Sequence, residues 1–232
     1  SFLDEGAKVI LVARNKKKLK LTESELKKKY GEDKVWSKVC DCTNAESLAE
    51  LHNSINKEFG SINTVISNIG DGRSVSDPIP DNIRWQQTWN SNFESALLTA
   101  RTFLPMLEDS RGVLLFVSSI AGLEAFGAPT DYSTAKTAII ALAKNMARKL
   151  APNVRVNVVA PGNVYFRGGS WDEKIKQDKK RVEEIIKATV PMNRFATPGE
   201  VADAVVFLCS DRAKFITGST LVIDGGQTVG LM

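Results

Sequence analysis

The sequence has little cysteine and histidine, which narrows the chemistry that it can support. There are three cysteines, Cys40, Cys42 and Cys209, and one histidine, His52. A structural zinc site needs about four such ligands at close spacing, and a disulfide framework needs more cysteines. A single histidine also argues against a Ser-His-Asp hydrolase, and we interpret His52 as a surface residue of an amphipathic helix. We therefore predict no metal site and no disulfide framework.

Long apolar runs and a large net charge are absent as well. No apolar stretch approaches the roughly 18 residues that a membrane-spanning helix needs, and no signal peptide precedes the first expected strand. The 31 basic and 27 acidic side chains leave a net charge of +4, and basic residues are not interleaved with aromatic ones. These absences predict a cytoplasmic protein that binds neither a membrane nor nucleic acid. The 232 residues, 43% of them hydrophobic, are enough for one α/β domain over 1–232.

The stretch from Val113 to Lys136 organises the rest of the chain. Residues 113–117 form a continuous apolar run, which is typical of a strand buried on both faces of a parallel sheet. This run ends at Ser118 and Ser119. Because ligands bind at the carboxyl ends of strands in open parallel sheets, the end of this run is a candidate site.

A helix is predicted from Asp131 onward, because apolar residues recur at intervals of three and four. The i, i+4 spacing puts Tyr132 and Lys136 on one face of this helix. A free tyrosine has a pKa of about 10, and a nearby ammonium favours the phenolate and lowers that pKa. Tyr132 is therefore a candidate general acid or base, with Ser119 beside it. Taken alone, such a pair is more often two surface residues.

Short apolar segments alternate with helical patterns along the whole chain. A long helical pattern from about Asp81 to Leu107, with a break, carries the polar Asn92. There is no internal repeat and no low-complexity linker. This alternation predicts an α/β fold with a doubly wound parallel sheet in a single domain. The expected strands are residues 8–13, 34–39, 62–67, 113–117, 154–159 and 220–223.

These segments and their polar residues resemble the short-chain dehydrogenases/reductases. Ser119, then Tyr132 thirteen residues later, then Lys136 four residues further on, have the catalytic spacing of that family. The likeness extends from Gly6 to the C-terminus, and several matches in order are more specific than any one alone. The further matches are Asn68-Ile69-Gly70, Asn92, Pro161-Gly162 and Asp224-Gly225-Gly226.

The resemblance implies an NADP(H)-dependent oxidoreductase that interconverts a carbonyl and an alcohol without a metal. Tyr132 would donate the proton, Lys136 would lower the pKa of Tyr132 and hold the cofactor ribose, and Ser119 would bind the substrate oxygen. Asn92 would hold a water molecule in the proton relay. The substrate classes that the family covers include 3-oxoacyl-(acyl-carrier-protein) thioesters, sugars, steroids and small alcohols, and its members imply a homotetramer or dimer. The alternative is a catalytically inactive binding or regulatory protein with the same fold.

The cofactor contacts that the resemblance implies lie along the carboxyl ends of the expected strands. One departure occurs there, because Phe166 stands where the family commonly has a threonine that contacts the cofactor. The implied contacts are Asn68 and Gly70 beneath the cofactor, Pro161-Gly162 over the nicotinamide, the backbone of Val164, and Tyr132 with Lys136.

Two charged residues bear on which nicotinamide cofactor is bound. In NAD-binding members of the family an acid ends the strand at 8–13, whereas here Ala13 is followed by Arg14. A guanidinium there suits a 2′-phosphate through charge-assisted hydrogen bonds, which predicts NADP(H); the alternative is a solvated basic helix face. Asp41 follows the next strand, where it either lies near the adenine or precedes the helix that begins near Asn44 as a capping residue.

The beginning of the sequence gives a further expectation. Residues 1–6 have the pattern of a last helical turn closed by Gly6, which leads directly into the strand at 8–13. In the family, a first strand and a glycine-rich turn that holds the cofactor pyrophosphate precede this point. Without that strand its neighbours would carry unpaired backbone groups, so we expect the native chain to extend upstream by roughly two dozen residues.

Residues 166–190 are rich in both charges and fit the family's variable lid over the substrate. Trp171 either covers an apolar face of the substrate or packs within the lid. Arg167 either belongs to a solvated lid or meets an anionic group of the substrate, and helical pairing of opposite charges favours the solvated lid.

Overall fold

The computed structural model describes residues 1–73, 75 and 77–230. In this part of the chain the strands are all parallel, and each predicted strand is found within about two residues of its expected limits. The last of them agrees with its expected limits at both ends. The strands are β1 (Val9–Ala13), β2 (Val35–Val39), β3 (Thr64–Ser67), β4 (Val113–Val117), β5 (Arg155–Pro161) and β6 (Thr220–Ile223).

Helices follow the strands as the sequence pattern predicts. Several of them begin where an Asn, Asp or Thr side chain accepts a hydrogen bond from the backbone N–H three residues later: Asn15, Asn44, Asp81 and Thr197. No helix in the described residues is long and apolar enough to cross a membrane. The helices are α1 (Lys16–Tyr30), α2 (Ala45–Phe59), α3 (Asn82–Trp89), α4 (Ser95–Ser110), α5 (Thr130–Leu150), α6 (Ser170–Gln177), α7 (Lys179–Thr189) and α8 (Pro198–Cys209).

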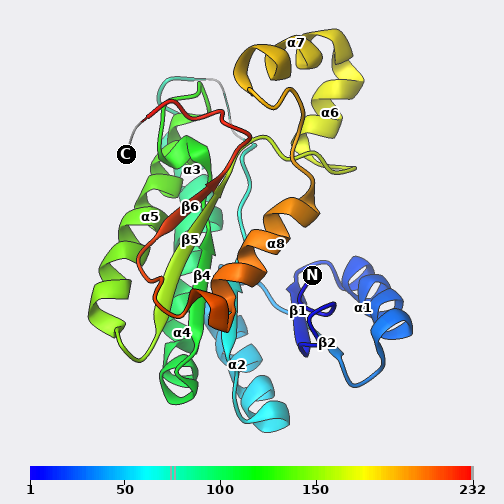
Figure 1. Cartoon of the computed structure of the whole chain (residues 1–232), viewed down its shortest axis with the longest axis vertical. Coiled ribbons are helices and arrows are strands. Elements are labelled where there is room, and N and C mark those ends of the chain that lie inside the picture. Colours follow the sequence, from blue (N-terminus) through cyan, green and yellow to red (C-terminus); the bar gives the residue numbers. More distant parts are fainter. Residues whose placement is uncertain (74, 76, 231–232) are drawn as a thin grey trace.

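The predicted parallel α/β architecture is confirmed, but the strands fall into two sheets. One sheet has the order β3-β4-β5-β6, and β1 with β2 forms a separate pair. Figure 1 shows that β1, β2 and α1 form a unit to one side of the larger sheet. Among the described residues, β1 pairs only with β2 and β3 pairs only with β4, so each has one edge without a neighbouring strand.

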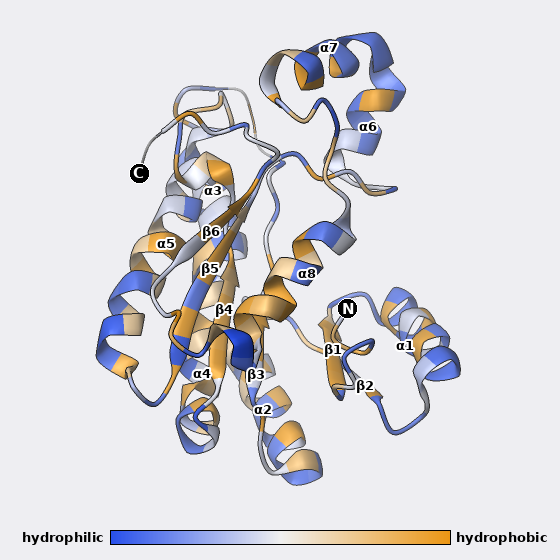
Figure 2. Ribbon diagram, in the orientation of Figure 1, coloured by the Kyte–Doolittle hydropathy of each residue, from blue (hydrophilic) through white to orange (hydrophobic). Residues whose placement is uncertain are grey.

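The core lies on both faces of the four-stranded sheet. Since side chains alternate along a strand, Leu114 and Phe116 of β4 face α4 and α5, whereas Leu115 faces α8. These three side chains have no exposed surface. Figure 2 shows the corresponding hydrophobic colouring of β4 and β5 between the helices. An apolar strand covered on both faces is what the sequence pattern of 113–117 predicts.

Two helical features bear on the site. The expected break in the long helical pattern is a π-helical turn, Asn90–Glu94, between α3 and α4. Helices α6 and α7 stand above α8 as a helical pair (Figure 1), in the segment that the sequence assigns to a lid.

Candidate active site

The catalytic candidates meet at the carboxyl end of β4. The Ser118 hydroxyl there donates a hydrogen bond of 2.8 Å to the carbonyl oxygen of Lys136 in α5. Gly122 lies so close to α5 that a Cβ atom on it would be 2.7 Å from the Lys136 carbonyl carbon. Only glycine fits such an approach, so the loop after β4 is held tightly against the second turn of α5.

Lys136 is buried beside the phenol of Tyr132. Its side chain is 4% exposed, and its Nζ donates a hydrogen bond of 3.1 Å to the carbonyl oxygen of Val117. The same Nζ lies 5.6 Å from the centroid of the Tyr132 ring. Burial disfavours the charged ammonium and lowers the pKa of Lys136 to about 8. At neutral pH the side chain therefore still carries its proton.

The expected lowering of the tyrosine pKa is not what the structure gives. Burial raises the pKa of Tyr132, the negative charge of Asp71 raises it further, and a hydrogen bond with Ser119 partly opposes both effects. The ammonium of Lys136 lies toward the ring face and does not bond the phenol oxygen, so the effect of burial on the Tyr132 pKa is the largest one. Tyr132 is consequently protonated at neutral pH, which suits a proton donor.

Asn92 lies in the π-helical turn and is fully buried. Its amide nitrogen donates to the carbonyl oxygens of Thr88 at 3.0 Å and Asp71 at 3.1 Å, and its amide oxygen accepts from the Asp71 N–H at 3.2 Å. These bonds occupy the side chain with the loop that follows β3. The structure thus gives Asn92 a positioning task, which the sequence pattern did not predict.

The loop after β3 passes directly over the catalytic candidates. A Cβ atom on Gly70 would lie 2.6 Å from the Asn92 amide oxygen and 2.9 Å from Lys136 Nζ. The next glycine, Gly72, is less crowded, because a Cβ atom on it would lie at an ordinary contact distance of 3.5 Å from the Tyr132 ring. Any side chain at Gly70 would displace the groups that the site needs, which explains the glycine.

Arg14 and Asp41 come together at the carboxyl ends of β1 and β2. Their closest charged atoms are 3.9 Å apart, and the Arg14 side chain is 73% exposed. The Asp41 carboxylate accepts hydrogen bonds from the N–H and hydroxyl of Thr43, which, with Arg14, hold the pKa of Asp41 below its usual value. Asn44, not Asp41, caps α2, although Asp41 closes the turn before it.

The remaining predicted cofactor contacts lie at the ends of β3 and β5. Asn68 is exposed directly after β3, and Gly162 donates its N–H to the carbonyl oxygen of Ile223 at 2.9 Å, which joins the Pro161-Gly162 turn to β6. Val164 forms an isolated bridge with Ala196. Phe166 is 53% exposed, and its ring lies against Gly169, where a Cβ atom would be 2.8 Å from the ring carbon Cζ.

Three polar atoms that the sequence pattern did not single out point to a ligand at this edge. Ser67 Oγ, Asn163 Nδ2 and Gln227 Oε1 are buried without a hydrogen-bond partner among the described residues. They follow or end β3, β5 and β6, which places all three at the carboxyl edge of the four-stranded sheet. Because buried polar atoms are nearly always satisfied, a polar molecule at this edge is the simplest source of the missing partners. No sequence motif identifies these three residues. Their positions at or after the ends of strands are the signal that could have found them.

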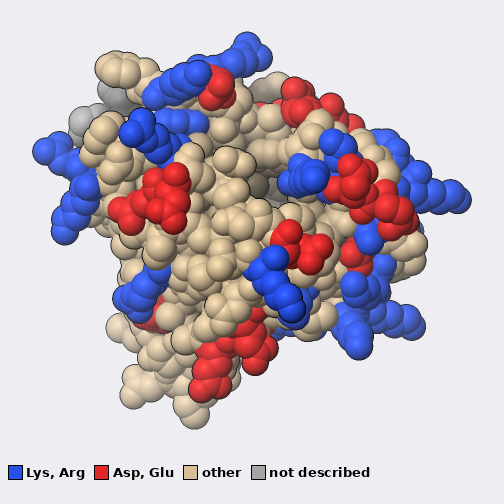
Figure 3. All heavy atoms as spheres, turned by 90° about the horizontal axis from the view of Figure 1, so that it is seen from below, with Lys and Arg blue, Asp and Glu red and all other residues tan. Residues whose placement is uncertain are grey.

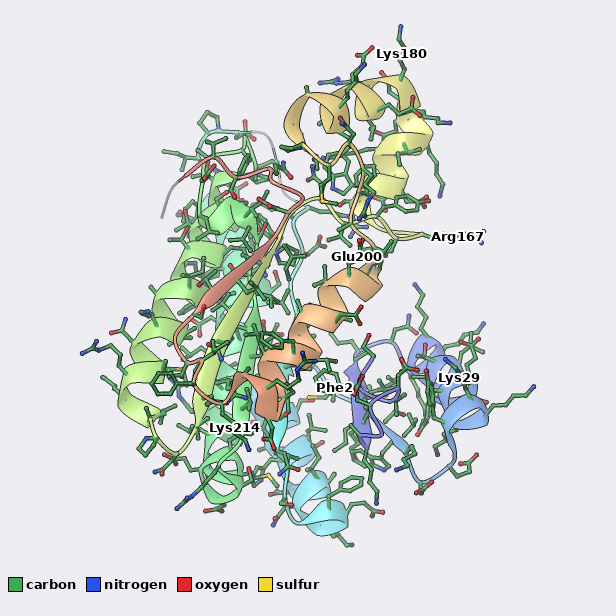
Figure 4. The ribbon with its side chains drawn as sticks, in the orientation of Figure 1. Phe2, Lys29, Arg167, Lys180, Glu200 and Lys214 are labelled. Atoms are coloured by element: carbon green, nitrogen blue, oxygen red, sulfur yellow. The ribbon has the colours of Figure 1, made fainter. Side chains whose placement is uncertain are left out.

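The structure places the two lid residues, Trp171 and Arg167, for which the sequence left two alternatives each. Trp171 packs within the lid, with its ring 5.3 Å from that of Phe195 and Lys174 Nζ 4.4 Å above it. Arg167 points outward from its loop in Figure 4, away from the sheet. This conformation favours the solvated alternative for Arg167. His52 is half-buried, with its ring 6.0 Å from that of Phe103, so it is less exposed than expected.

The charges and cysteines provide no competing site. The described residues contain no cluster of His, Cys, Asp and Glu that could hold a metal ion, and the three cysteines are free. Basic and acidic side chains are interspersed on the face seen in Figure 3. The polar edge of the four-stranded sheet is therefore the candidate active site.

Comparison with known proteins agrees with this geometry. The family model described as enoyl-(acyl carrier protein) reductase matches residues 1–228. A short-chain dehydrogenase/reductase of Arabidopsis thaliana, SDRA, is 34% identical over 225 residues, which are 96% of this chain and 85% of that protein. The 3-oxoacyl-[acyl-carrier-protein] reductase FabG of Thermotoga maritima is 29% identical over 230 residues, which are 98% of this chain and 90% of that protein.

Solved structures give the same assignment. The L-sorbose reductase of Gluconobacter frateurii in complex with NADPH and L-sorbose has a TM-score of 0.92 and 28% identity, over 99% of this chain and 90% of that one. An NADPH-bound short-chain oxidoreductase of Pseudomonas aeruginosa, described as having an atypical catalytic center, has the same TM-score and coverage at 26% identity. With a family match over nearly its whole length and the catalytic candidates gathered at one edge of the sheet, the chain belongs to the short-chain dehydrogenase/reductase family of oxidoreductases.

Proposed function

We propose that this protein is an NADP(H)-dependent oxidoreductase that reduces a carbonyl to an alcohol, or catalyses the reverse. The observation that carries the proposal is the arrangement of a protonated Tyr132, a hydrogen-bonding Ser119 and a buried Lys136 at the carboxyl end of β4. Hydride transfer is the chemistry that the nicotinamide supplies when bound. The protein's own residues would orient the carbonyl and supply the proton.

Each residue has a task that its surroundings support. Tyr132 would donate its phenolic proton to the carbonyl oxygen, because burial keeps that proton in place at neutral pH. Ser119 would hold the same oxygen, and the protonated Lys136 would stabilise the phenolate that remains. Asn92 would hold the loop at Asp71 over the site through its three hydrogen bonds to that loop and to α3.

The residues present also fit a dinucleotide phosphate. Arg14 offers an exposed guanidinium at the end of β1, as a 2′-phosphate requires. The unpartnered atoms of Ser67, Asn163 and Gln227 support a polar ligand at the sheet edge. Asp41 would lie near the adenine. The remaining proposed contacts are those of Asn68, Gly70, Pro161, Gly162, Val164, Tyr132 and Lys136.

The relatives are named for chemically different substrates, so they do not narrow the substrate of this protein to one class. They include a 3-oxoacyl-[acyl-carrier-protein] reductase, a tropinone reductase-like protein and an L-sorbose reductase. We propose a test panel of one 3-oxoacyl thioester, one bicyclic ketone and one keto sugar, each with NADPH. A wild-type protein that binds NADPH but reduces no member of the panel would favour the non-catalytic alternative.

The decisive experiment replaces the proposed proton donor. Tyr132→Phe should lower kcat/KM by about 10² to 10⁴ on whichever substrate is turned over, which is the usual contribution of a positioned acid. Tyr30→Phe is the matched control, because Tyr30 ends α1 and hydrogen-bonds to Asp4, neither of which belongs to the proposed site. Turnover that survives within a fewfold in Tyr132→Phe would disprove the assignment.

We also propose that the protein is a homotetramer or dimer, as in other members of the family. Light scattering of the purified chain measures this directly, and a monomer would contradict it.

A further inference from the structure

The lid contains a cavity that the proposed reaction does not use. It has a volume of about 490 Å³ and lies between the end of α6, one face of α7 and residues 193–195. That volume is within the range of roughly 300–1,000 Å³ that small-molecule sites have. Its lining contains none of Asn92, Ser119, Tyr132 or Lys136. The cavity is therefore lined by residues other than the proposed catalytic ones.

The walls of this cavity are apolar. Ile175, Val182, Ile186 and Phe195 contribute to its lining, and two of them, Val182 and Ile186, are 4% and 5% exposed. The ring of Phe195 also packs against Trp171. An apolar chain in this space would remove from water its own surface and that of Ile175 and Phe195, which are only half-buried.

The rim of the cavity is basic. Lys179, Lys187 and Arg194 line it, together with the single carboxylate of Glu183. Arg194 is held by two hydrogen bonds to Glu200, at 2.6 and 2.9 Å, and Lys179 lies 3.6 Å from Glu183. Within the described residues, no ion pair involves Lys187. One ammonium at the mouth thus has no carboxylate of its own.

We propose that this cavity binds a small amphipathic carboxylate, with its aliphatic chain between α7 and Phe195 and its carboxylate at Lys187. A strongly hydrated polyanion does not fit, because the walls offer it no partners to replace water. A neutral hydrocarbon fits the walls but leaves the Lys187 ammonium unpaired. A monoanion with one chain satisfies both parts of the site.

The probe is octanoate, titrated into the full chain by calorimetry, with tryptophan fluorescence as a second reading, since Trp171 packs against Phe195 of the cavity wall. We expect saturable binding that tightens by about two- to fourfold for each methylene from hexanoate to octanoate, as burial of the chain requires. Lys187→Ala should weaken octanoate by about fivefold, the size of one partly exposed ion pair. Octanol should bind more weakly by a similar factor.

Two variants locate the site. Lys180→Ala is the matched control, because Lys180 lies on the same helix and points away from the lid in Figure 4; it should leave the affinity unchanged. Ile175→Asp places a carboxylate in the wall and should abolish binding, with circular dichroism checking that the lid remains helical. Absence of saturable binding, equal effects of Lys187→Ala and Lys180→Ala, or binding of anionic vesicles without binding of free octanoate would each overturn the proposal. Because the measurement is binding alone, its failure is independent of the proposed reaction.

Discussion

The four-stranded sheet and the β1–β2 unit are built from similar strands but are held together differently. Helix α5 lies on the larger sheet through Ala135, Ile139, Ala143 and Ala147, all at most 2% exposed. Helix α1, in contrast, has only Leu19 and Glu23 buried. The catalytic candidates therefore lie on a helix with many buried side chains, whereas Arg14 precedes a helix with few.

Between α1 and its strands, the smaller unit combines few buried side chains with specific polar contacts. Glu23 accepts a hydrogen bond of 2.6 Å from Lys20 within α1 and one of 2.7 Å from the Ser37 hydroxyl of β2, and Lys20 also donates to that hydroxyl at 3.1 Å. The two bonds to Ser37 join α1 to the strand pair. The bond from Lys20 is the first of the causes that lower the pKa of Glu23. Every residue of β1 is only half-buried. Ile10, Val12 and Trp36 of β1 and β2 also pack against a buried apolar cluster that includes side chains of α2 and α4. We infer that the catalytic half is held by full burial, whereas the Arg14 side is held by half-buried apolar contacts together with these specific bonds.

The largest expected effect tests this contrast with one substitution made in both regions. Leu114→Ala in β4 removes a fully buried side chain and should destabilise the protein by about 3–5 kcal/mol. Leu11→Ala in β1 removes a half-buried one and should cost less than about 2 kcal/mol. Urea unfolding of the two variants measures both values. Equal destabilisation would show that the two regions are equally buried in solution.

The second effect concerns Arg14, the exposed cation of the smaller unit. Arg14→Ala should weaken NADPH binding by about tenfold to a hundredfold and leave NADH binding unchanged, since a charge-assisted hydrogen bond to the 2′-phosphate is lost. Titration of both cofactors measures the ratio. Lys17→Ala, an exposed cation in the first turn of α1, is the control. Equal or tighter binding of NADH by the wild type would contradict the role of Arg14.

The third effect is the pH dependence of kcat/KM, which tests the buried ammonium of Lys136 beside the larger sheet. The pKa of Lys136 is lowered to about 8 by burial, whereas burial raises that of Tyr132. Both groups are protonated below about pH 7, so kcat/KM for reduction should be constant there and fall by up to tenfold per pH unit above about pH 8. Lys144→Ala, on the exposed side of α5, should keep this profile. An alkaline limit near pH 10 would assign the titration to a group other than Lys136.

The smallest effect concerns the contact between the lid and the loop over the site. Arg73 donates two hydrogen bonds to Glu173 of α6, at 2.9 and 3.2 Å, across 100 residues of sequence. Arg73→Ala should raise KM by about two- to fivefold, as expected for an exposed ion pair, and added salt should reduce the difference. A double-mutant cycle with Glu173→Gln measures the coupling, and Lys179→Ala, which breaks a pair within α7, is the control. Zero coupling would show that this pair does not hold the lid.

The sequence was sufficient for the elements and for the catalytic spacing. Residues 113–117 could be assigned to a central strand because a short continuous apolar run is typical of a strand that is buried on both faces of a parallel sheet. The four-residue step from Tyr132 to Lys136 places both side chains on the same face of their helix. Local rules act over a few residues, so the strand limits of 220–223 and the break near Asn92 followed from the pattern.

Only the tertiary structure decided how these groups behave. The direction of the Tyr132 pKa depends on how deeply α5 is buried and on Asp71, which comes from a loop 61 residues earlier in the chain. The same holds for the unpartnered atoms of Ser67, Asn163 and Gln227, and for the lid cavity. Burial and electrostatic interaction are set by neighbours in space, whereas periodicity and spacing are set by neighbours in sequence. The sequence by itself therefore determined the secondary-structure elements and predicted which residues meet at the end of β4, whereas the fold determined how deeply these residues are buried and which groups surround them.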